Sequence, residues 1–258
     1  MRVFLDSHVH IYPFHDVGAS FDAIIANLPC GQNGDFRMAC LTERYDCALF
    51  EDLLAGRVPG ISGRYRAEST ESGSVLKLVR NDDQAFYLVA GQQIVTSENI
   101  EILALNMLER VSEGQNAGDT VESVLAAGGL PVVAWAPGKW FGSRGEVVKS
   151  LLDRFTPRQI ALGDTSLRPL EWPTPFIMRA AEHRGFRVLA GSDPLPFAGE
   201  EIRPGCYFSI ADTGRGTVMP DAWLTGLLND PDTRLSPGRR RPGITTVATR
   251  MLRHKRAG

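Results

Sequence analysis

The stretch VFLDSHVHIYP, residues Val3–Pro13, decides how this sequence is interpreted. Its apolar start is typical of a buried β-strand over Val3–His8. His8 and His10 are two residues apart, so on an extended strand both imidazoles point to the same face. Imidazole is a common ligand for Zn, Mn or Fe ions, and a metal site is one interpretation of this pair. The other is that both are ordinary surface or hydrogen-bonded histidines.

The rest of the chain alternates between strand-like and helix-like segments, which is typical of an α/β fold. Apolar runs rich in β-branched residues predict strands at Val3–His8, Arg37–Thr42, Ser74–Arg80, Ala85–Val95, Ile100–Asn106, Pro131–Ala136, Gln159–Gly163 and Arg187–Gly191. Helical spacing predicts helices at Ala19–Leu28, Thr120–Ala127, Glu146–Phe155 and Pro175–Arg184. Ser143 and Glu146 form a capping-box pattern before the third of these helices.

Composition predicts an ordinary globular protein. The 258 residues are 43% hydrophobic and 22% charged, which excludes a chain that is disordered throughout. No linker divides residues 1–258, so we expect a single domain. We also expect a cytoplasmic protein with no membrane association, because no apolar run is long enough to cross a bilayer and no signal peptide is visible. The four cysteines form no Cys-x-x-Cys pair, which favours reduced, buried thiols.

Charge is distributed unevenly along the chain. From about residue 233 onward there are eight Lys or Arg residues and no acid, although the formal net charge of the whole chain is −2. Such a basic tail could contact nucleic acid, anionic lipid or a protein partner, but a solvated face is the simpler interpretation. Ile244, Val247, Met251 and Leu252 recur at helical spacing and predict a helix with an apolar edge. The oligomeric state cannot be predicted.

Polar residues that follow predicted strands are the first candidates for chemistry, because functional side chains gather at strand ends in α/β barrels. Asp193 is the best candidate for a carboxylate that shares one ion with His8 and His10. Asp164 is a general base, an extra metal ligand, or the partner of Arg168 in an ion pair that fixes the loop.

A second candidate region is the loop Gly138–Glu146, which precedes a predicted helix. Its backbone amides, with Lys139 and Arg144, could bind a phosphate or carboxylate. Alternatively, the glycines of this loop serve turns and its aromatic residues cover the mouth of the fold.

Together these motifs resemble the polymerase and histidinol phosphatase (PHP) family. The resemblance rests on their order: Asp-x-His-x-His after the first strand, Thr42-Glu43 after the second, a Gly-containing hairpin before an apolar strand, and a late Gly191-Ser192-Asp193. It implies a distorted (β/α)7 TIM-like barrel, related to the amidohydrolases, with up to three metal ions. It also implies hydrolysis of phosphoesters.

Several of the family's metal ligands are replaced in this sequence. Arg44 stands where the family has a histidine, Gln93 where it has a bridging glutamate, Trp135 or a neighbour where it has a histidine, and Leu195 where it has a last histidine. The resemblance therefore implies a metal set of His8, His10 and Asp193, with Gln93 as a weak fourth oxygen. Such a set supports one Zn, Mn or Fe ion or none.

We accordingly predict a metal-dependent hydrolase, with a phosphoesterase acting on a small anionic molecule as the leading hypothesis. Asp164, Arg44 and Arg168 are the predicted catalytic residues, and Lys139, Arg144 and Glu43 are predicted to bind substrate. Arg44 could supply in fixed form the positive charge of a lost ion, or it could pair with Glu43 or Asp46. Two alternatives stay open: a non-catalytic ligand-binding or interaction protein, and an amidohydrolase-type enzyme acting on a carbonyl centre. Nucleic acid is a less favoured partner.

Overall fold

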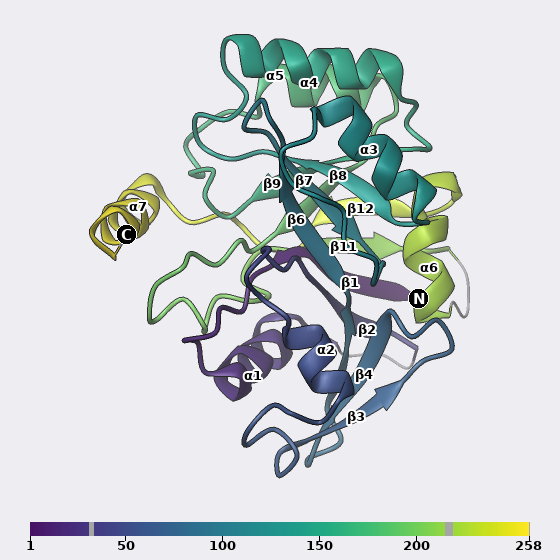
Figure 1. Cartoon of the computed structure of the whole chain (residues 1–258), viewed down its shortest axis with the longest axis vertical. Coiled ribbons are helices and arrows are strands. Elements are labelled where there is room, and N and C mark those ends of the chain that lie inside the picture. Colours follow the sequence, from purple (N-terminus) through teal and green to yellow (C-terminus); the bar gives the residue numbers. More distant parts are fainter. Residues whose placement is uncertain (31–33, 215–218, 258) are drawn as a thin grey trace.

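The strands form two mixed sheets in the computed structural model, which describes residues 1–30, 34–214 and 219–257 (Figure 1). The seven-stranded sheet has the order β12-β11-β1-β2-β5-β4-β3, and the five-stranded sheet has the order β10-β9-β8-β7-β6. The strands are β1 (Arg2–Val9), β2 (Phe36–Leu41), β3 (Tyr65–Ser69), β4 (Val75–Arg80), β5 (Ala85–Val89), β6 (Gly91–Val95), β7 (Glu101–Leu105), β8 (Leu130–Ala134), β9 (Ala161–Thr165), β10 (Val188–Gly191), β11 (Ser209–Asp212) and β12 (Arg234–Pro237).

The helices pack outside the two sheets. They are α1 (Val17–Asn27), α2 (Leu49–Leu54), α3 (Ala117–Ala126), α4 (Ser143–Arg154), α5 (Phe176–His183), α6 (Pro220–Gly226) and α7 (Ile244–Ala257), with a short 3-10 turn at Leu227–Asn229. Helices α3, α4 and α5 cover the outer face of the five-stranded sheet, whereas α1 and α2 lie beside the other sheet (Figure 1). None of the helices in the described part of the chain has the length and apolar character to cross a membrane.

The expected distorted (β/α)7 barrel is wrong. The fold is α/β, but the described strands form two separate mixed sheets and no closed barrel. The predicted strand Ala85–Val95 shows where the expectation fails, because it divides into β5 of one sheet and β6 of the other. At the break a Cβ on Gly91 would lie 2.6 Å from the Ala104 carbonyl oxygen, so glycine allows the backbones to approach closely. Gly91-Gln92-Gln93 interrupts the apolar pattern here, but this interruption alone does not show that the chain changes sheet.

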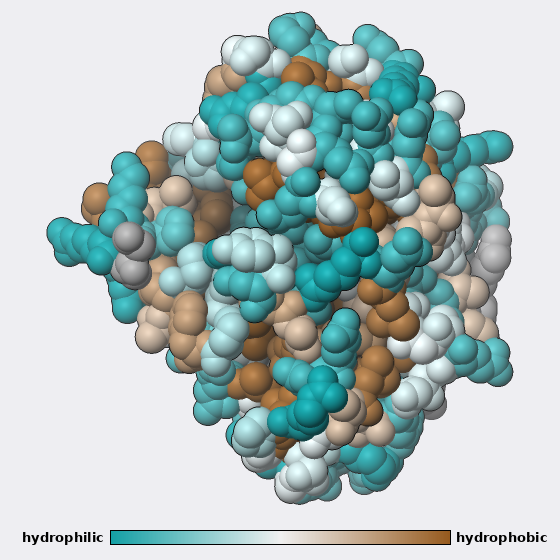
Figure 2. All heavy atoms as spheres, viewed as in Figure 1, coloured by the Kyte–Doolittle hydropathy of each residue, from teal (hydrophilic) through white to brown (hydrophobic). Residues whose placement is uncertain are grey.

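The core lies in layers that follow the two-residue period of the strands. On β1, Val3 and Leu5 belong to an apolar cluster between the sheets, while Phe4 faces a second cluster with α1. On β8, Val132 and Val133 divide in the same way between the inner cluster and the layer under α3, α4 and α5. Hydrophilic side chains cover most of the face shown in Figure 2, with apolar patches between them.

Two details of the predicted helices differ from the structure. Helix α4 begins at Ser143 itself with Gly142 as N-cap, so the expected capping box is not formed. The tail does form a helix, α7, whose Val247 is buried and whose Met251 packs on an apolar cluster. Ile244 and Leu252 are exposed, so only half of the predicted apolar edge packs against the rest of the protein.

The buried carboxylate of Asp6 on β1 accepts hydrogen bonds from backbone that is distant in sequence, at Ser192 and Gly205. Asp6 is inaccessible to solvent and accepts hydrogen bonds from three backbone N–H groups, those of His8 (3.2 Å), Ser192 (2.9 Å) and Gly205 (2.7 Å). Burial raises the pKa of Asp6 to about 7. This side chain is therefore a structural link between segments that are distant in sequence.

Replacing Asp6 with Asn is expected to lower the free energy of unfolding by about 1–3 kcal/mol, because one of these buried N–H groups then faces an amide donor. Urea unfolding of the variant beside wild type measures the change. Asp83→Asn, in an exposed turn, is the matched control. Equal losses in both variants would contradict the structural role of Asp6.

Candidate metal centre

The candidate site lies where the two sheets meet. The amide of Asp193, just after β10, donates to the His8 carbonyl of β1 at 2.8 Å, which joins the sheets on one side. On the other side the Gln93 amide of β6 donates to the Glu43 carbonyl just after β2, at 2.9 Å. His8, His10, Gln93 and Asp193 therefore come from three separate parts of the chain to one place.

Three polar atoms converge in this place at hydrogen-bonding distance. The Nε2 atoms of His8 and His10 are 2.9 Å apart, and Gln93 Oε1 lies 3.0 Å and 3.1 Å from them. Asp193 Oδ1 is slightly farther, at 3.7 Å from His8 Nε2 and 3.8 Å from His10 Nε2. Both histidines and Asp193 are buried.

These three short contacts cannot all be hydrogen bonds. Each Nε2 of a neutral imidazole carries either a proton or a lone pair, and donors and acceptors cannot alternate around a triangle. At least one pair among His8, His10 and Gln93 thus places two donors or two acceptors face to face, whichever way the Gln93 amide is turned. A cation that accepts all the lone pairs removes this conflict, so the arrangement fits a bound metal ion.

Electrostatics also favour metal ligation at this site. Burial lowers the pKa of His8 to about 4 and that of His10 to about 3, so both imidazoles are neutral near pH 7 with lone pairs to donate. Burial raises the pKa of Asp193, while His10 and Arg250 act in the opposite direction. Asp193 also has a φ of 49°, a left-handed conformation that Asp tolerates better than most residues.

The donor set suits one ion of borderline softness. Ligand atoms of His8, His10 and Asp193 lie within 4.8 Å of one another, a group that can hold a metal ion. Two imidazole nitrogens and a carboxylate oxygen, with Gln93 as a neutral oxygen, match zinc, manganese or iron(II). A single carboxylate supplies too little negative charge for a second ion.

A pocket of about 300 Å³ opens beside this group, lined in part by His10, Gln93 and Asp193. Arg44 also lines it, and its guanidinium lies 5.9 Å from the Tyr12 ring centre and 3.4 Å from Asp46. The arginine is one-third exposed, and an incoming anion can reach it. The pocket thus places a positive charge next to the candidate metal group.

The other predicted site residues lie elsewhere. Asp164 and Arg168 form a buried bidentate ion pair at 2.7 Å and 2.6 Å, in a separate cleft. The Glu43 carboxylate pairs with Arg110 at 3.1 Å and lines a different pocket. The catalytic roles of Asp164 and Arg168 and the binding role of Glu43 stay predictions, but these groups do not line the pocket of His10.

Both predicted anion-binding side chains of the loop Gly138–Glu146 make contacts within the chain. Lys139 pairs with Glu101 at 3.2 Å, and Arg144 donates to the Gly138 carbonyl at 2.7 Å. Substrate binding by Lys139 and Arg144 stays a prediction. Lys139 is the closer of the two to the candidate site, because its partner Glu101 lines the pocket.

Sequence reasoning missed several residues on the pocket wall, among them Tyr12, Glu101 and His254. The sequence does indicate that Tyr12 lies on the same face as His8 and His10, because it follows them at the same two-residue spacing. Glu101 begins β7, and only the pairing of β7 with β6 brings it near Gln93. His254 belongs to α7, and its Nδ1 is buried without a hydrogen-bond partner among the described residues.

Helix α7 is held against the site by a buried arginine. Arg250 pairs with Glu200, with Arg250 Nη2 at 2.5 Å from Glu200 Oε2, and both side chains are almost fully buried. The same guanidinium donates to Ser166 Oγ at 2.9 Å and to the backbone carbonyl of Asp193 at 3.1 Å. Arg250 therefore fixes both the helix and the residue that supplies the candidate carboxylate ligand.

Comparison with known proteins shows a likeness of fold. No family model matches the chain, and no curated protein sequence matches it. The crystal structure of PsfC from Pseudomonas syringae PB-5123 aligns with a TM-score of 0.62 at 15% identity, over 100% of this chain and 99% of PsfC. At this identity the likeness concerns the fold alone.

Two structures of endonuclease Q align less well. The lesion-specific endonuclease from Pyrococcus furiosus gives a TM-score of 0.49 at 14% identity, over 91% of this chain and 58% of its own. Endonuclease Q in complex with a 27-mer duplex gives 0.48 at 12% identity, over 89% of this chain and 57% of its own. This chain thus spans little more than half of these proteins, and at such TM-scores the likenesses establish nothing about it.

Proposed function

We propose that this chain is a mononuclear metal-dependent hydrolase acting on a small anionic substrate, with a phosphoester as the best-matched class. The observation that carries the proposal is the convergence of His8, His10, Gln93 and Asp193 beside Arg44. We further propose that residues 1–258 form one domain and that the chain is a divergent relative of the PHP family, as the motif order suggests.

In this proposal His8, His10 and Asp193 hold the ion and Gln93 adds a neutral oxygen. A bound divalent ion would supply an activated water near neutral pH and would polarise a substrate oxygen. Arg44 binds the anionic group of the substrate, because its planar guanidinium matches phosphate oxygens in pairs. Glu101, Glu113 and His254 are among the groups on the pocket wall that can exchange a proton with a leaving group.

The test is a hydrolysis assay on apoprotein reloaded with Zn²⁺, Mn²⁺ or Fe²⁺ in turn. The substrates are p-nitrophenyl phosphate, bis(p-nitrophenyl) phosphate and a p-nitroanilide amide. We expect metal-dependent release of p-nitrophenol from a phosphoester. Arg44→Ala should lower kcat/KM about 100-fold, the typical cost of one charge-stabilising donor, while exposed Arg57→Ala leaves it unchanged.

Each other outcome decides against the proposal in a specific way. Cleavage of the amide but of neither phosphoester would support the amidohydrolase-type alternative. Metal binding without turnover of any substrate would support the non-catalytic binding protein. Phosphoester hydrolysis that persists in EDTA would contradict metal dependence altogether.

A further inference from the structure

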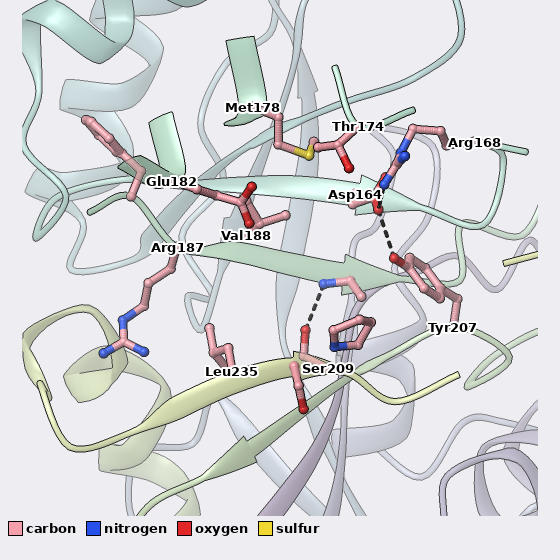
Figure 3. Close-up of a pocket in the computed structure, with 14 residues that line it drawn as sticks. Asp164, Arg168, Thr174, Met178, Glu182, Arg187, Val188, Tyr207, Ser209 and Leu235 are labelled. Atoms are coloured by element: carbon pink, nitrogen blue, oxygen red, sulfur yellow. Dashed lines mark hydrogen bonds and ion pairs between the residues drawn. The ribbon is translucent and has the colours of Figure 1, made fainter. Parts of the chain in front are cut away.

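A second cleft lies on the other side of the β9–β10 region, away from the histidines. It consists of two adjoining pockets of about 350 Å³ and 410 Å³, which share Arg168, Thr174, Tyr207 and Pro237. Figure 3 shows the first pocket, with Tyr207 and Ser209 at its floor and Arg187 at its far end. Its walls mix hydroxyl groups with apolar side chains, so it suits the body of a small polar molecule.

The second pocket is bordered by the arginine loop, which we define as Arg239–Arg241 between β12 and α7. Backbone hydrogen bonds hold both ends of this loop in place. The Gly238 amide donates to the Phe208 carbonyl at 2.8 Å, and the Leu170 amide donates to the Pro242 carbonyl at 2.9 Å. Gly238 packs so closely on the Phe208 ring that a Cβ would lie 1.9 Å from it. The arginines are therefore presented from an ordered backbone, which lowers the entropy cost of binding a ligand.

The charges around the arginine loop are not balanced. Asp164 accepts from Arg168, from Tyr207 Oη at 2.8 Å and from Arg241 at 3.4 Å, so one carboxylate faces two guanidinium groups. Arg239 donates only to the Asn27 side-chain oxygen, and Arg240 has no partner among the described residues.

The nearby carboxylates of Glu171 and Glu182 do not neutralise the excess positive charge around the arginine loop. Glu182 lines the first pocket, and Glu171 accepts from the Ile244 amide at the start of α7. A surplus of positive charge remains on one rim of the cleft.

From these observations we infer that the cleft is a binding site for a small phosphomonoester with a hydroxyl-bearing body. The phosphate binds to Arg240 and Arg241, since guanidinium groups recognise phosphate in a bidentate manner. The body enters the pocket beside Tyr207, where Thr174 and Ser236 have hydroxyls without partners in the described part of the chain. Asp164 keeps Arg168 and Arg241 in place.

This inference is independent of the proposed function. The site shares no lining residue with the pocket of His10 and requires no metal ion. Its failure would leave the metal centre untouched, and the reverse also holds.

The test is isothermal titration of full-length protein in EDTA with ribose 5-phosphate and with inorganic phosphate. We expect both to bind, ribose 5-phosphate more tightly, and Arg240→Ala/Arg241→Ala to weaken binding at least tenfold. His8→Ala/His10→Ala should bind as wild type. The matched control is Arg57→Ala/Arg66→Ala, which removes two exposed arginines, one of them on β3 at the opposite edge of the sheet from β12.

Arg240→Ala alone guards against a folding defect, because Arg240 has no hydrogen-bond or ion-pair partner among the residues that the structure describes. This variant should still weaken binding. No binding by the wild type would overturn the inference. So would binding that is kept in Arg240→Ala/Arg241→Ala or lost in His8→Ala/His10→Ala. Binding of a single-stranded oligonucleotide through these arginines, without binding of ribose 5-phosphate, would replace the small molecule with nucleic acid.

Discussion

Replacing both His8 and His10 with alanine is expected to weaken zinc binding roughly a thousandfold or more, since each tenfold change corresponds to about 1.4 kcal/mol and two nitrogen donors are lost. In the group of His8, His10 and Asp193, the two histidines supply nitrogen ligand atoms and the aspartate supplies an oxygen. The remaining oxygens, from Asp193 and Gln93, hold a borderline-soft ion poorly. Competition with a chromophoric chelator measures the affinity.

The matched control for this pair is His183→Ala, because His183 is exposed on α5 and distant in sequence from the site. Its zinc affinity should equal that of wild type. An unchanged affinity in His8→Ala/His10→Ala would place the metal elsewhere in the molecule. A similar loss in His183→Ala would show that the assay reports adventitious binding.

Replacing Arg250 with methionine is expected to lower the free energy of unfolding by about 3 kcal/mol, because the buried Glu200 carboxylate loses its close partner and keeps only the more distant Arg203, at 3.8 Å. The arginine also donates to the Asp193 carbonyl, so its loss should reduce zinc affinity about tenfold, as for other residues that hold a ligand in position. Chemical unfolding and the chelator assay measure the two effects.

Arg154→Met is the matched control, since Arg154 forms an Arg–Glu pair with Glu122 that is largely exposed. Such pairs contribute about 0–1 kcal/mol, so its stability should change little. Arg250→Met/Glu200→Leu should recover most of the loss, because the buried carboxylate is then removed as well and Arg203, which also pairs with it, is one-third exposed to water. A small effect of Arg250→Met would mean that α7 is not anchored through this residue.

Local patterns in the sequence predicted the parts of the molecule that depend on local chemistry. The two-residue spacing of His8 and His10 on an apolar strand was enough to place both imidazoles on one face. Asp193 was found because polar side chains after strands meet at the sheet ends. The α/β class followed from the alternation of strand and helix patterns.

The remaining features depend on contacts between distant segments. The chain changes sheet next to Gly91, where a Cβ would lie 2.6 Å from the Ala104 carbonyl oxygen. The sequence marks this place with a glycine and two glutamines, but it does not show which strands lie on either side. Glu101 reaches the pocket only through the pairing of β7 with β6, and His254 only because Arg250 holds α7 against Glu200. A basic tail that looks solvated in sequence thus contains one buried arginine that is central to the site.

Elemental analysis of the wild-type protein, purified without chelators, measures whether the chain holds a metal ion. We expect close to one equivalent of zinc, manganese or iron per chain, held by His8, His10 and Asp193. Less than about a tenth of an equivalent, with no uptake on dialysis against these ions, would contradict this expectation.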